Sequence, residues 1–349
     1  MFNDPSVIEG DYLFDILSQP QALEDTLRAL LPAKPLQRLA AQMNRGKFQR
    51  IVLTGMGSSF HALHPLNLEL IGLGYTAVMV ETSELVHYQK AILDPKTLLV
   101  AVSQSGRSAE MLRLIKANRG HSPLIAVTNT PESPLAASAD AVVLTRAGKE
   151  FSVSCKTYVT ALMALQWLAA VLAERDLDRA RRELAHASSA VANYLCAWKE
   201  YVRTLAQDWK GIRHLFLVGR GGSLAAAGAG ALIVKESDHF HAEGMSSAAF
   251  RHGPFEMLSQ ETFVLVFSGG RKTKDLNRRL REDVQIQGGR AELLGEESLY
   301  APLRIPAMGG QVRSILEILP VQMVTLAIAA QTGREPGKFE LASKVTTIE

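Results

Sequence analysis

A group of acid–base side chains follows a buried, uncharged segment in the second half of the chain. Leu215–Val218 predicts a strand, the glycines at 219, 221 and 222 predict a tight turn, and residues 223–234 predict a buried Ala-rich helix. This helix ends near Glu236, and His252 closes a run of polar side chains sixteen residues later. A carboxylate at the end of an apolar helix, near imidazoles, is suited to proton transfer.

Both residues also have simpler interpretations. Glu236 could form a surface ion pair with Lys235, although the uncharged residues before it argue against an exposed helix face. His252 precedes Gly253-Pro254 and could merely complete a turn. We expect chemistry from both, because a histidine titrates near neutrality and can donate or accept a proton there.

A second set of polar groups lies where a predicted strand, Leu98–Val102, passes into a helix. The loop between them carries Ser103, Gln104, Ser105 and Ser108. With the free N–H groups and the dipole of the helix start, these side chains could bind a phosphate, and Gly106 lets the backbone turn closely. Ser58 and Ser59 occupy the equivalent loop after the first strand. Each serine taken singly could instead be a helix N-cap.

Two further interpretations have less support. The turns Gly55-x-Gly57 and Gly219-x-Gly221 suggest a dinucleotide site, but the third glycine of that pattern is missing from the first turn. His239, His241 and Glu243 could suggest a metal, but their spacing suits a ligand set poorly. We therefore predict neither a metal nor a cofactor.

Short apolar strands that alternate with helical segments must position these loops. Strands are predicted at 51–54, 77–80, 98–102, 124–127 and 141–144. Residues 215–223 mirror 51–59 at an offset of 164, and 263–270 mirror 99–106 at the same offset, with further counterparts at 291–294 and 303–306. This order predicts a duplicated α/β unit whose parallel sheets are covered by helices on both faces.

The expected organisation has five parts. They are an N-terminal helical segment at 1–29, a first α/β domain at 30–172, a helical connector at 173–194, a second α/β domain at 195–335 and a C-terminal tail at 336–349. Residues 157–173 predict a buried helix that is shorter than the roughly 20 residues needed to span a bilayer.

Composition narrows the class of protein. With 47% hydrophobic and 21% charged residues, the chain is typical of a soluble globular protein. The net charge of +3 comes without a dense basic block, so we expect no nucleic-acid partner. Two cysteines, Cys155 and Cys196, and an N-terminus without a basic leader indicate a cytoplasmic protein with no membrane partner.

Taken together, the motifs resemble the double SIS (sugar isomerase) family. They are Ser103-Gln-Ser-Gly, Ala147-Gly-Lys-Glu-Phe-Ser-Val-Ser, Gly219-Arg-Gly, Lys235-Glu236, His241-Ala-Glu243, Arg251-His-Gly-Pro and Lys344-Val-Thr-Thr-Ile-Glu. The resemblance covers nearly the whole chain and is to the isomerase half of the glucosamine-6-phosphate synthases. It implies two tandem flavodoxin-like units of three αβα layers each. Glutamine hydrolysis is not expected, because no glutaminase domain is recognised.

The resemblance also implies a role for each residue. Substrate contacts would come from Gly57, Ser58, Ser59, Ser103, Gln104, Ser105, Ser108, Val153, Ser154 and Ser343, with Ser103–Ser108 at the sugar phosphate. Glu236 would move a proton between C1 and C2, and His252 of the neighbouring subunit in a homodimer would open the sugar ring. Lys344 would form an imine with the keto carbon. The partners implied are a small-molecule sugar phosphate and a second copy of the chain.

Three departures from the synthase pattern leave the reaction open. Ile233 stands where the synthases have a second lysine, and Arg107 stands where the family often has an acidic residue. The turn at 152–156 is one residue shorter. We therefore predict an isomerase or deaminase that acts on a hexose-6-phosphate or aminohexose-6-phosphate through ring opening and C1–C2 proton transfer. The alternatives are a deglycase of sugar-amine 6-phosphates and a non-catalytic sugar-phosphate sensor.

Overall fold

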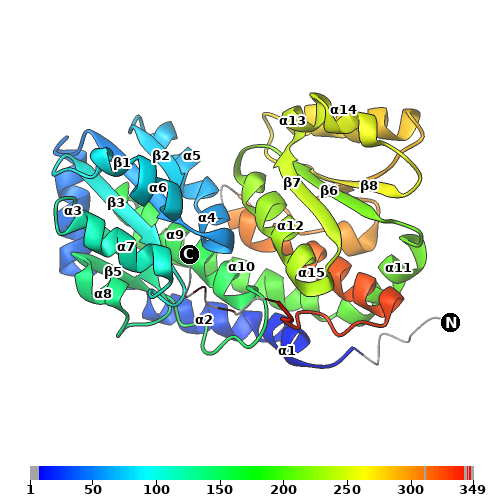
Figure 1. Cartoon of the computed structure of the whole chain (residues 1–349), viewed down its shortest axis with the longest axis horizontal. Helices are drawn as coiled ribbons and strands as arrows, with labels where there is room; N and C mark the ends of the chain where they lie inside the picture. Colours follow the sequence, from blue (N-terminus) through cyan, green and yellow to red (C-terminus); the bar gives the residue numbers. More distant parts are fainter. Residues whose placement is uncertain (1–7, 310–311, 342–343, 345, 347–349) are drawn as a thin grey trace. The chain divides into compact units, whose positions relative to one another are not determined.

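The computed structural model of the chain describes residues 8–309, 312–341, 344 and 346. The chain divides into two compact units, each built on its own parallel sheet (Figure 1). Of the described residues, the sheet A unit comprises 19–150, 155–188, 341, 344 and 346, and the sheet B unit comprises 8–18, 151–154, 189–309 and 312–340.

Sheet A has five parallel strands in the order β2-β1-β3-β4-β5. The strands are β1 (Arg50–Gly55), β2 (Ala77–Glu81), β3 (Thr97–Val102), β4 (Leu124–Thr128) and β5 (Ala141–Leu144). All five were predicted, because strands covered on both faces are short unbroken apolar runs. The strand order is that of the flavodoxin-like folds.

Helices cover both faces of sheet A. On one face, α6 (Thr82–Tyr88), α7 (Ala109–Asn118) and α8 (Pro134–Ser138) pack through Leu85, Met111 and Leu135 onto Val52, Leu99 and Ala126. On the other face, α9 (Lys156–Leu172) lies against β4 and β5. The helices that contact α9 are α2 (Gln19–Ala29), α3 (Lys34–Asn44), α4 (Gly57–His61) and α5 (His64–Gly72). Every residue of α9 is buried, which confirms the predicted core helix.

Sheet B has four parallel strands in the order β7-β6-β8-β9. They are β6 (His214–Gly219), β7 (His241–Ser246), β8 (Thr262–Phe267) and β9 (Arg290–Leu294). Phe250 of α13 (Ser247–Arg251) and Leu280 of α14 (Lys274–Ile286) pack with Phe216 and Val264 on one face. Helix α12 (Leu224–Asp238) contacts β6 and β7, and α15 (Arg313–Thr332) contacts α12 and α11 (Trp198–Asp208). Helix α1 (Asp11–Leu17) belongs to the same unit.

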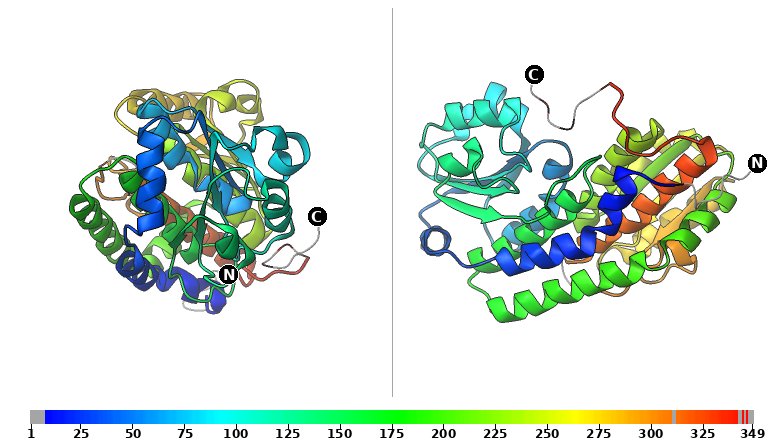
Figure 2. Two further views of the ribbon diagram at one scale, coloured as in Figure 1. Left: turned by 90° about the vertical axis from the view of Figure 1, so that its left-hand side faces the viewer. Right: turned by 90° about the horizontal axis from the view of Figure 1, so that it is seen from below.

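Four short 3₁₀ turns complete the described elements: η2 (Lys90–Ile92), η3 (Gly221–Ser223), η4 (Pro254–Met257) and η5 (Ala301–Leu303). The charged connector begins the long helix α10 (Leu177–Leu195), which runs along the lower edge of the right-hand view in Figure 2. Leu184, Ala187 and Val191 of α10 are buried, so this helix is amphipathic rather than an exposed linker.

Two details of the predicted repeat are wrong. Residues 303–306 form no strand; a single bridge joins Gly295 to Arg304, and Pro302 and Pro306 lack the N–H groups that would extend it. Strand β7 was not predicted, because this edge strand is polar and, of its residues, Ala242 alone is buried. Its Gly244 is required, since a Cβ there would overlap the Ala227 carbonyl oxygen of α12.

The offset between the two copies also changes along the chain. Arg50 and His214 begin β1 and β6, an offset of 164, whereas Thr97 and Thr262 begin β3 and β8, an offset of 165. Ser103 therefore corresponds to Ser268 rather than to Phe267. The backbone agrees, because the N–H of each serine donates to the last part of the next strand, at Val127 and Leu294 respectively.

Helix α15 is long and apolar enough to cross a membrane by length and composition. In the structure, 89% of the most apolar 18-residue stretch of this helix is buried inside the protein. The core helices of water-soluble folds pass the same test of length and hydropathy, and α15 packs against α11 and α12 as such a helix does.

Candidate functional site

The segments after β1 and β3 lie at the point of sheet A where the strand order reverses. Strands β1 and β3 are neighbours, and the chain continues from them toward opposite edges, to β2 and to β4. Ligands of open α/β sheets bind beyond the carboxyl ends of the strands at this switch point. The hydroxyl-bearing segments predicted from the sequence are therefore the two segments at this position.

The loop Ser103–Ser108, here called the serine loop, connects β3 to α7. Ser108 is the N-cap of α7 and accepts a hydrogen bond of 3.4 Å from the Met111 N–H. Ser103 Oγ accepts from the Gly106 N–H at 3.1 Å, and Ser105 Oγ accepts from the Arg107 N–H at 3.4 Å. Each hydroxyl that accepts in this way keeps its own proton to donate. The N-cap interpretation and the ligand interpretation are therefore compatible.

The carbonyl oxygen of Gln104 fixes the serine loop to the end of β4. It accepts hydrogen bonds from the Asn129 N–H at 3.1 Å and from the hydroxyls of Thr128 and Thr130, both at 3.2 Å. Three donors on one carbonyl hold the loop in a single conformation. The half-buried side chains of Ser103, Gln104 and Ser105 are then preorganised at the switch point.

Gly106 has no possible substitute in this loop. Its φ of +61° lies in the left-handed region, and a Cβ would overlap the Ser133 side chain at the start of α8. Its carbonyl oxygen accepts a hydrogen bond of 3.2 Å from the Leu135 N–H. The glycine therefore lets the serine loop pack directly against α8.

The second hydroxyl pair, Ser58 and Ser59, lies in the short helix α4 directly after β1, so the prediction of a loop at this position was wrong. Ser58 and Ser59 are half-buried, and Gly57 is exposed with φ of +51°. These three residues and the serine loop all belong to the sheet A unit, as the sequence predicted for neighbouring strand ends.

Lys344 also belongs to the sheet A unit, where it contacts a buried carboxylate. Its Nζ lies 2.7 Å from Glu150 Oε2. Both residues line a cavity of about 640 Å³, to which Gln104 and Ser105 of the serine loop contribute as well. The amine on the tail and the hydroxyl-bearing loop therefore share one cavity. Ser343 lies outside the described residues.

The turn that carries Val153 and Ser154 belongs to the sheet B unit. Asp15 Oδ2 accepts from the N–H groups of Phe151 and Ser152 at 2.7 and 3.1 Å, and Ser152 Oγ donates to the Gly337 carbonyl at 2.6 Å. Val153 as a whole residue is 1% exposed, so it offers a ligand almost no surface. Ser154 is half-buried.

The proposed proton-transfer residues belong to the sheet B unit. Glu236 is half-buried in the last turn of α12, and His252 is exposed directly after α13. Ile233, one turn before Glu236, is 1% exposed and packs in the core. The position at which the family resemblance implies a lysine is thus an apolar packing position in this chain.

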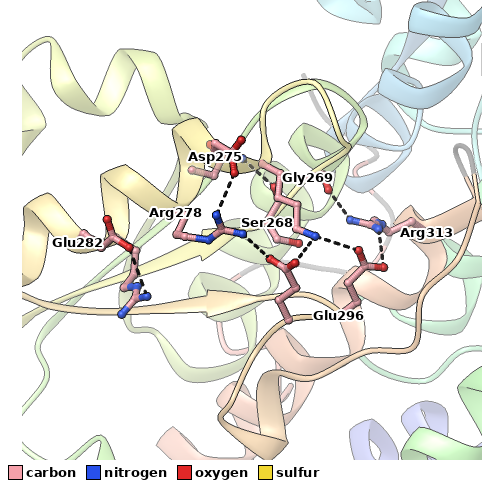
Figure 3. Close-up of polar contacts among 11 residues, drawn as sticks. Ser268, Gly269, Asp275, Arg278, Glu282, Glu296 and Arg313 are labelled. Carbon is pink, nitrogen blue, oxygen red and sulfur yellow. Dashed lines mark hydrogen bonds and ion pairs between the residues drawn. The ribbon is translucent and has the colours of Figure 1, made fainter.

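The loop of sheet B that corresponds to the serine loop, Ser268–Thr273, has a different environment. Gly269 and Gly270 replace Gln104 and Ser105. Arg313 donates to the Gly269 carbonyl and lies 3.3 Å from Glu296, which also lies 3.4 Å from Lys274 (Figure 3). Ion pairs within the protein therefore surround this loop, whereas the serine loop offers hydroxyls. The loop of sheet B keeps hydroxyl residues at its two ends, Ser268 and Thr273, but lacks polar side chains at the positions of Gln104 and Ser105.

Of the histidines considered as metal ligands, His239 is the C-cap residue of α12 and His241 begins β7. His241 Nδ1 faces His214 Nδ1 at 3.4 Å across the β6–β7 pair, and His241 Nε2 lies 3.7 Å from Glu243. Within residues 8–309 and the other described positions, no three His, Cys, Asp or Glu side chains form a cluster that could hold a metal.

The sequence interpretation missed Glu150, although the residue lies inside a quoted motif. A signal was present: Glu150 is the last carboxylate before a helix that is buried along its whole length. The N–H groups at the start of such a helix need acceptors. Glu150 supplies one, because its Oε1 accepts from the N–H groups of Cys155 and Thr157 at 3.0 and 2.9 Å.

Comparison with known proteins agrees with this architecture. The SIS domain family model matches residues 47–171 and 210–291, one segment on each sheet. Glutamine–fructose-6-phosphate aminotransferase (isomerizing) of Pyrococcus horikoshii is 28% identical over 348 residues, covering 97% of this chain and 57% of that protein. The chain thus spans a little more than half the length of this relative.

Solved structures show the same fold. The C-terminal domain of glucosamine-fructose-6-phosphate aminotransferase from Francisella tularensis superposes with a TM-score of 0.83 at 21% identity, covering 95% of this chain and 99% of that one. Glucosamine-6-phosphate deaminase from Thermotoga maritima gives 0.78 at 19% identity, covering 97% and 100%. The chain belongs to the SIS domain family and is homologous to the isomerase part of glutamine–fructose-6-phosphate aminotransferase.

Proposed function

We propose that this protein is a phosphosugar isomerase or aminosugar-phosphate deaminase that acts on a hexose or aminohexose 6-phosphate. The observation that carries the proposal is the serine loop, fixed by three hydrogen bonds to the Gln104 carbonyl at the switch point of sheet A. Hydroxyl protons and the start of the ten-residue helix α7 at one place suit a phosphate dianion. The names of the relatives, a fructose-6-phosphate aminotransferase and a glucosamine-6-phosphate deaminase, support a sugar as the rest of the ligand.

The proposed chemistry divides among three side chains. His252 opens the sugar ring, and Glu236 takes the proton from C1 or C2 and returns it to the other carbon. The amine of Lys344 forms an imine with the keto carbon, which acidifies the neighbouring C–H bond. These steps move a proton and an electron pair within the sugar and need no redox partner. We propose that the protein acts as a homodimer in the cytoplasm and that His252 serves the neighbouring subunit.

The second candidate is a sensor that binds a sugar phosphate without turnover. The buried Ile233 favours it, because the family resemblance implies a proton-carrying lysine at that position. A deglycase of sugar-amine 6-phosphates is a third possibility that would use the same serine loop and the same acid–base pair.

A panel of fructose, glucose and glucosamine 6-phosphates distinguishes the isomerase, the deaminase and the sensor when release of ammonia and formation of ketose or aldose are followed separately. Ammonia indicates a deaminase, ketose–aldose exchange alone indicates an isomerase, and binding without either indicates a sensor. In an enzyme, Glu236→Gln should lose about 10²–10⁴-fold in kcat, the usual contribution of a general base. Glu243→Gln, a carboxylate on β7 of the same unit, is the control and should keep wild-type activity. A Glu236→Gln variant with full activity would exclude the proposed proton transfer.

A further inference from the structure

The carboxylate of Glu150 has all its acceptor positions occupied in the sheet A unit. Its side chain has no exposed surface. Oε1 accepts from the N–H groups of Cys155 and Thr157, and Oε2 accepts from the Thr157 hydroxyl at 2.6 Å and from Lys344 Nζ at 2.7 Å. A carboxylate has about four lone-pair sites, and these four donors occupy them.

Lys344 reaches Glu150 from the C-terminal tail, and its own side chain is 25% exposed. Two residues further along, the Thr346 carbonyl accepts a hydrogen bond of 3.2 Å from the N–H of Ala109, the first residue of α7. The tail is thus attached to this unit at two points, by an ion pair at Lys344 and by a backbone bond next to the serine loop.

The ion pair faces the cavity that the serine loop borders. Glu150 and Lys344 share its wall with Gln104 and Ser105. The ammonium group of Lys344 is therefore held beside the space that a sugar phosphate would occupy, and one flank of it is open to solvent.

We propose that Glu150 is a positioning residue for Lys344: it holds the lysine ammonium at the wall of the cavity until a keto sugar phosphate enters. This inference rests on the proposed function only for the identity of the ligand. Three donors from Cys155 and Thr157 remain on Glu150 after the lysine leaves, so the carboxylate stays satisfied without it. The contact therefore holds the tail in place but can break when a ligand binds Lys344.

The covalent step that follows is balanced within the lysine and the sugar. The ammonium gives one proton to the carbonyl oxygen, and its nitrogen lone pair forms a bond to the keto carbon. A second proton then passes from the nitrogen to that oxygen, and the C–O bond breaks. The oxygen leaves as water with two hydrogens that were on the nitrogen, and the product is a protonated imine. No oxidant or additional co-reactant takes part, and Glu150 is unchanged at the end of the step.

The test measures the reactivity of Lys344 without any sugar. Intact protein is treated with a limiting amount of an amine acylating reagent across a range of pH, and acylation of Lys344 is quantified by peptide mass spectrometry relative to exposed lysines. In Glu150→Gln acylation of Lys344 at neutral pH should be about tenfold faster than in the wild type, because the charge-assisted hydrogen bond that holds the Lys344 ammonium is lost. Thr157→Val is the matched control. It removes one donor from Glu150 without touching Lys344, and its acylation profile should match that of the wild type.

Equal profiles in Glu150→Gln and wild type would overturn the proposal, as would an equally large change in Thr157→Val. Glu150→Asp keeps the charge but withdraws it by one methylene, so it should give an intermediate rate; it provides the test if the glutamine variant fails to fold. Borohydride reduction in the presence of each sugar phosphate is measured separately. No adduct at Lys344 and no turnover would refute the proposed function while the role of Glu150 stood, whereas turnover with a profile indifferent to Glu150 would refute this inference alone.

Discussion

Ser223 donates a hydrogen bond of 2.8 Å from its hydroxyl to Glu317, joining the loop after β6 to the buried face of α15. Glu317 is 1% exposed, and burial raises the pKa of its carboxyl from 4.5 to about 7. The Ser223 hydroxyl and the charge of Arg313 act in the opposite direction but are weaker. Glu317 is therefore a core carboxyl that changes its ionisation near neutral pH.

This pKa predicts a pH dependence of stability. Between pH 4.5 and 7 the folded protein keeps the proton of Glu317 while the unfolded chain has lost it, so raising the pH favours unfolding. The contribution should fall by about 1.4 kcal/mol per pH unit across this window and level off above it. Urea denaturation at several pH values should show this slope as the difference between wild type and Glu317→Gln. Burial also raises the pKa of Asp238, which makes its own contribution to the pH dependence. The difference between wild type and Glu317→Gln is therefore needed to obtain the contribution of Glu317 alone.

Gly244→Ala should destabilise the sheet B unit. A Cβ at this position would overlap the Ala227 carbonyl oxygen, so β7 and α12 would have to separate. Overpacking of this kind costs about 1–3 kcal/mol, which thermal unfolding measures readily. Gly270→Ala is the matched control: a Cβ there meets nothing within 4 Å, and its effect should stay within about 0.5 kcal/mol. Equal melting temperatures for the two variants would contradict the close helix–strand contact.

Ser105→Ala should weaken binding of a hexose 6-phosphate with little change in stability. Its hydroxyl accepts one long hydrogen bond at 3.4 Å in the free protein, so the fold depends little on it. A hydrogen bond to a charged phosphate contributes about 1.5–3 kcal/mol, so titration calorimetry should show a loss of roughly 10- to 100-fold in affinity.

Ser268→Ala in the corresponding loop of sheet B is the control for that measurement. The Ser268 hydroxyl is buried and makes no hydrogen bond within the part of the chain that the structure describes, so its removal should leave both affinity and stability nearly unchanged. A larger loss of affinity in Ser268→Ala than in Ser105→Ala would indicate that the phosphate binds at the loop of sheet B instead.

A site shared between subunits predicts complementation. Glu236→Gln and His252→Ala should each be inactive alone. After subunit exchange in an equal mixture, about a quarter of the sites should regain both wild-type residues if His252 comes from the neighbouring chain. Activity near that fraction would support the shared site, and a mixture as inactive as its components would show that each chain supplies its own histidine.

The sequence by itself determined most of the fold. Unbroken apolar runs such as Thr97–Val102 indicate strands covered on both faces, and the uncharged Lys156–Leu172 segment indicates a core helix. The repeat in the chain implied two parallel sheets. It also placed Ser58 and Ser103 after strands that proved to be neighbours, because strand order follows from short right-handed crossovers. Strand β7 could not be predicted in this way, because it is a polar edge strand and lacks the apolar run that marks a strand covered on both faces.

Tertiary structure decided the features that depend on contacts between distant segments. Residues 150 and 344 are 194 positions apart, and nothing in their local sequence indicates that a carboxylate and a tail lysine meet. The buried position of Glu317 beside Ser223 likewise arises from the packing of α15, because an acid in an apolar helix could equally face water. Local pattern reports which backbone conformation a segment prefers, whereas the partner of a buried charge is set by packing in three dimensions.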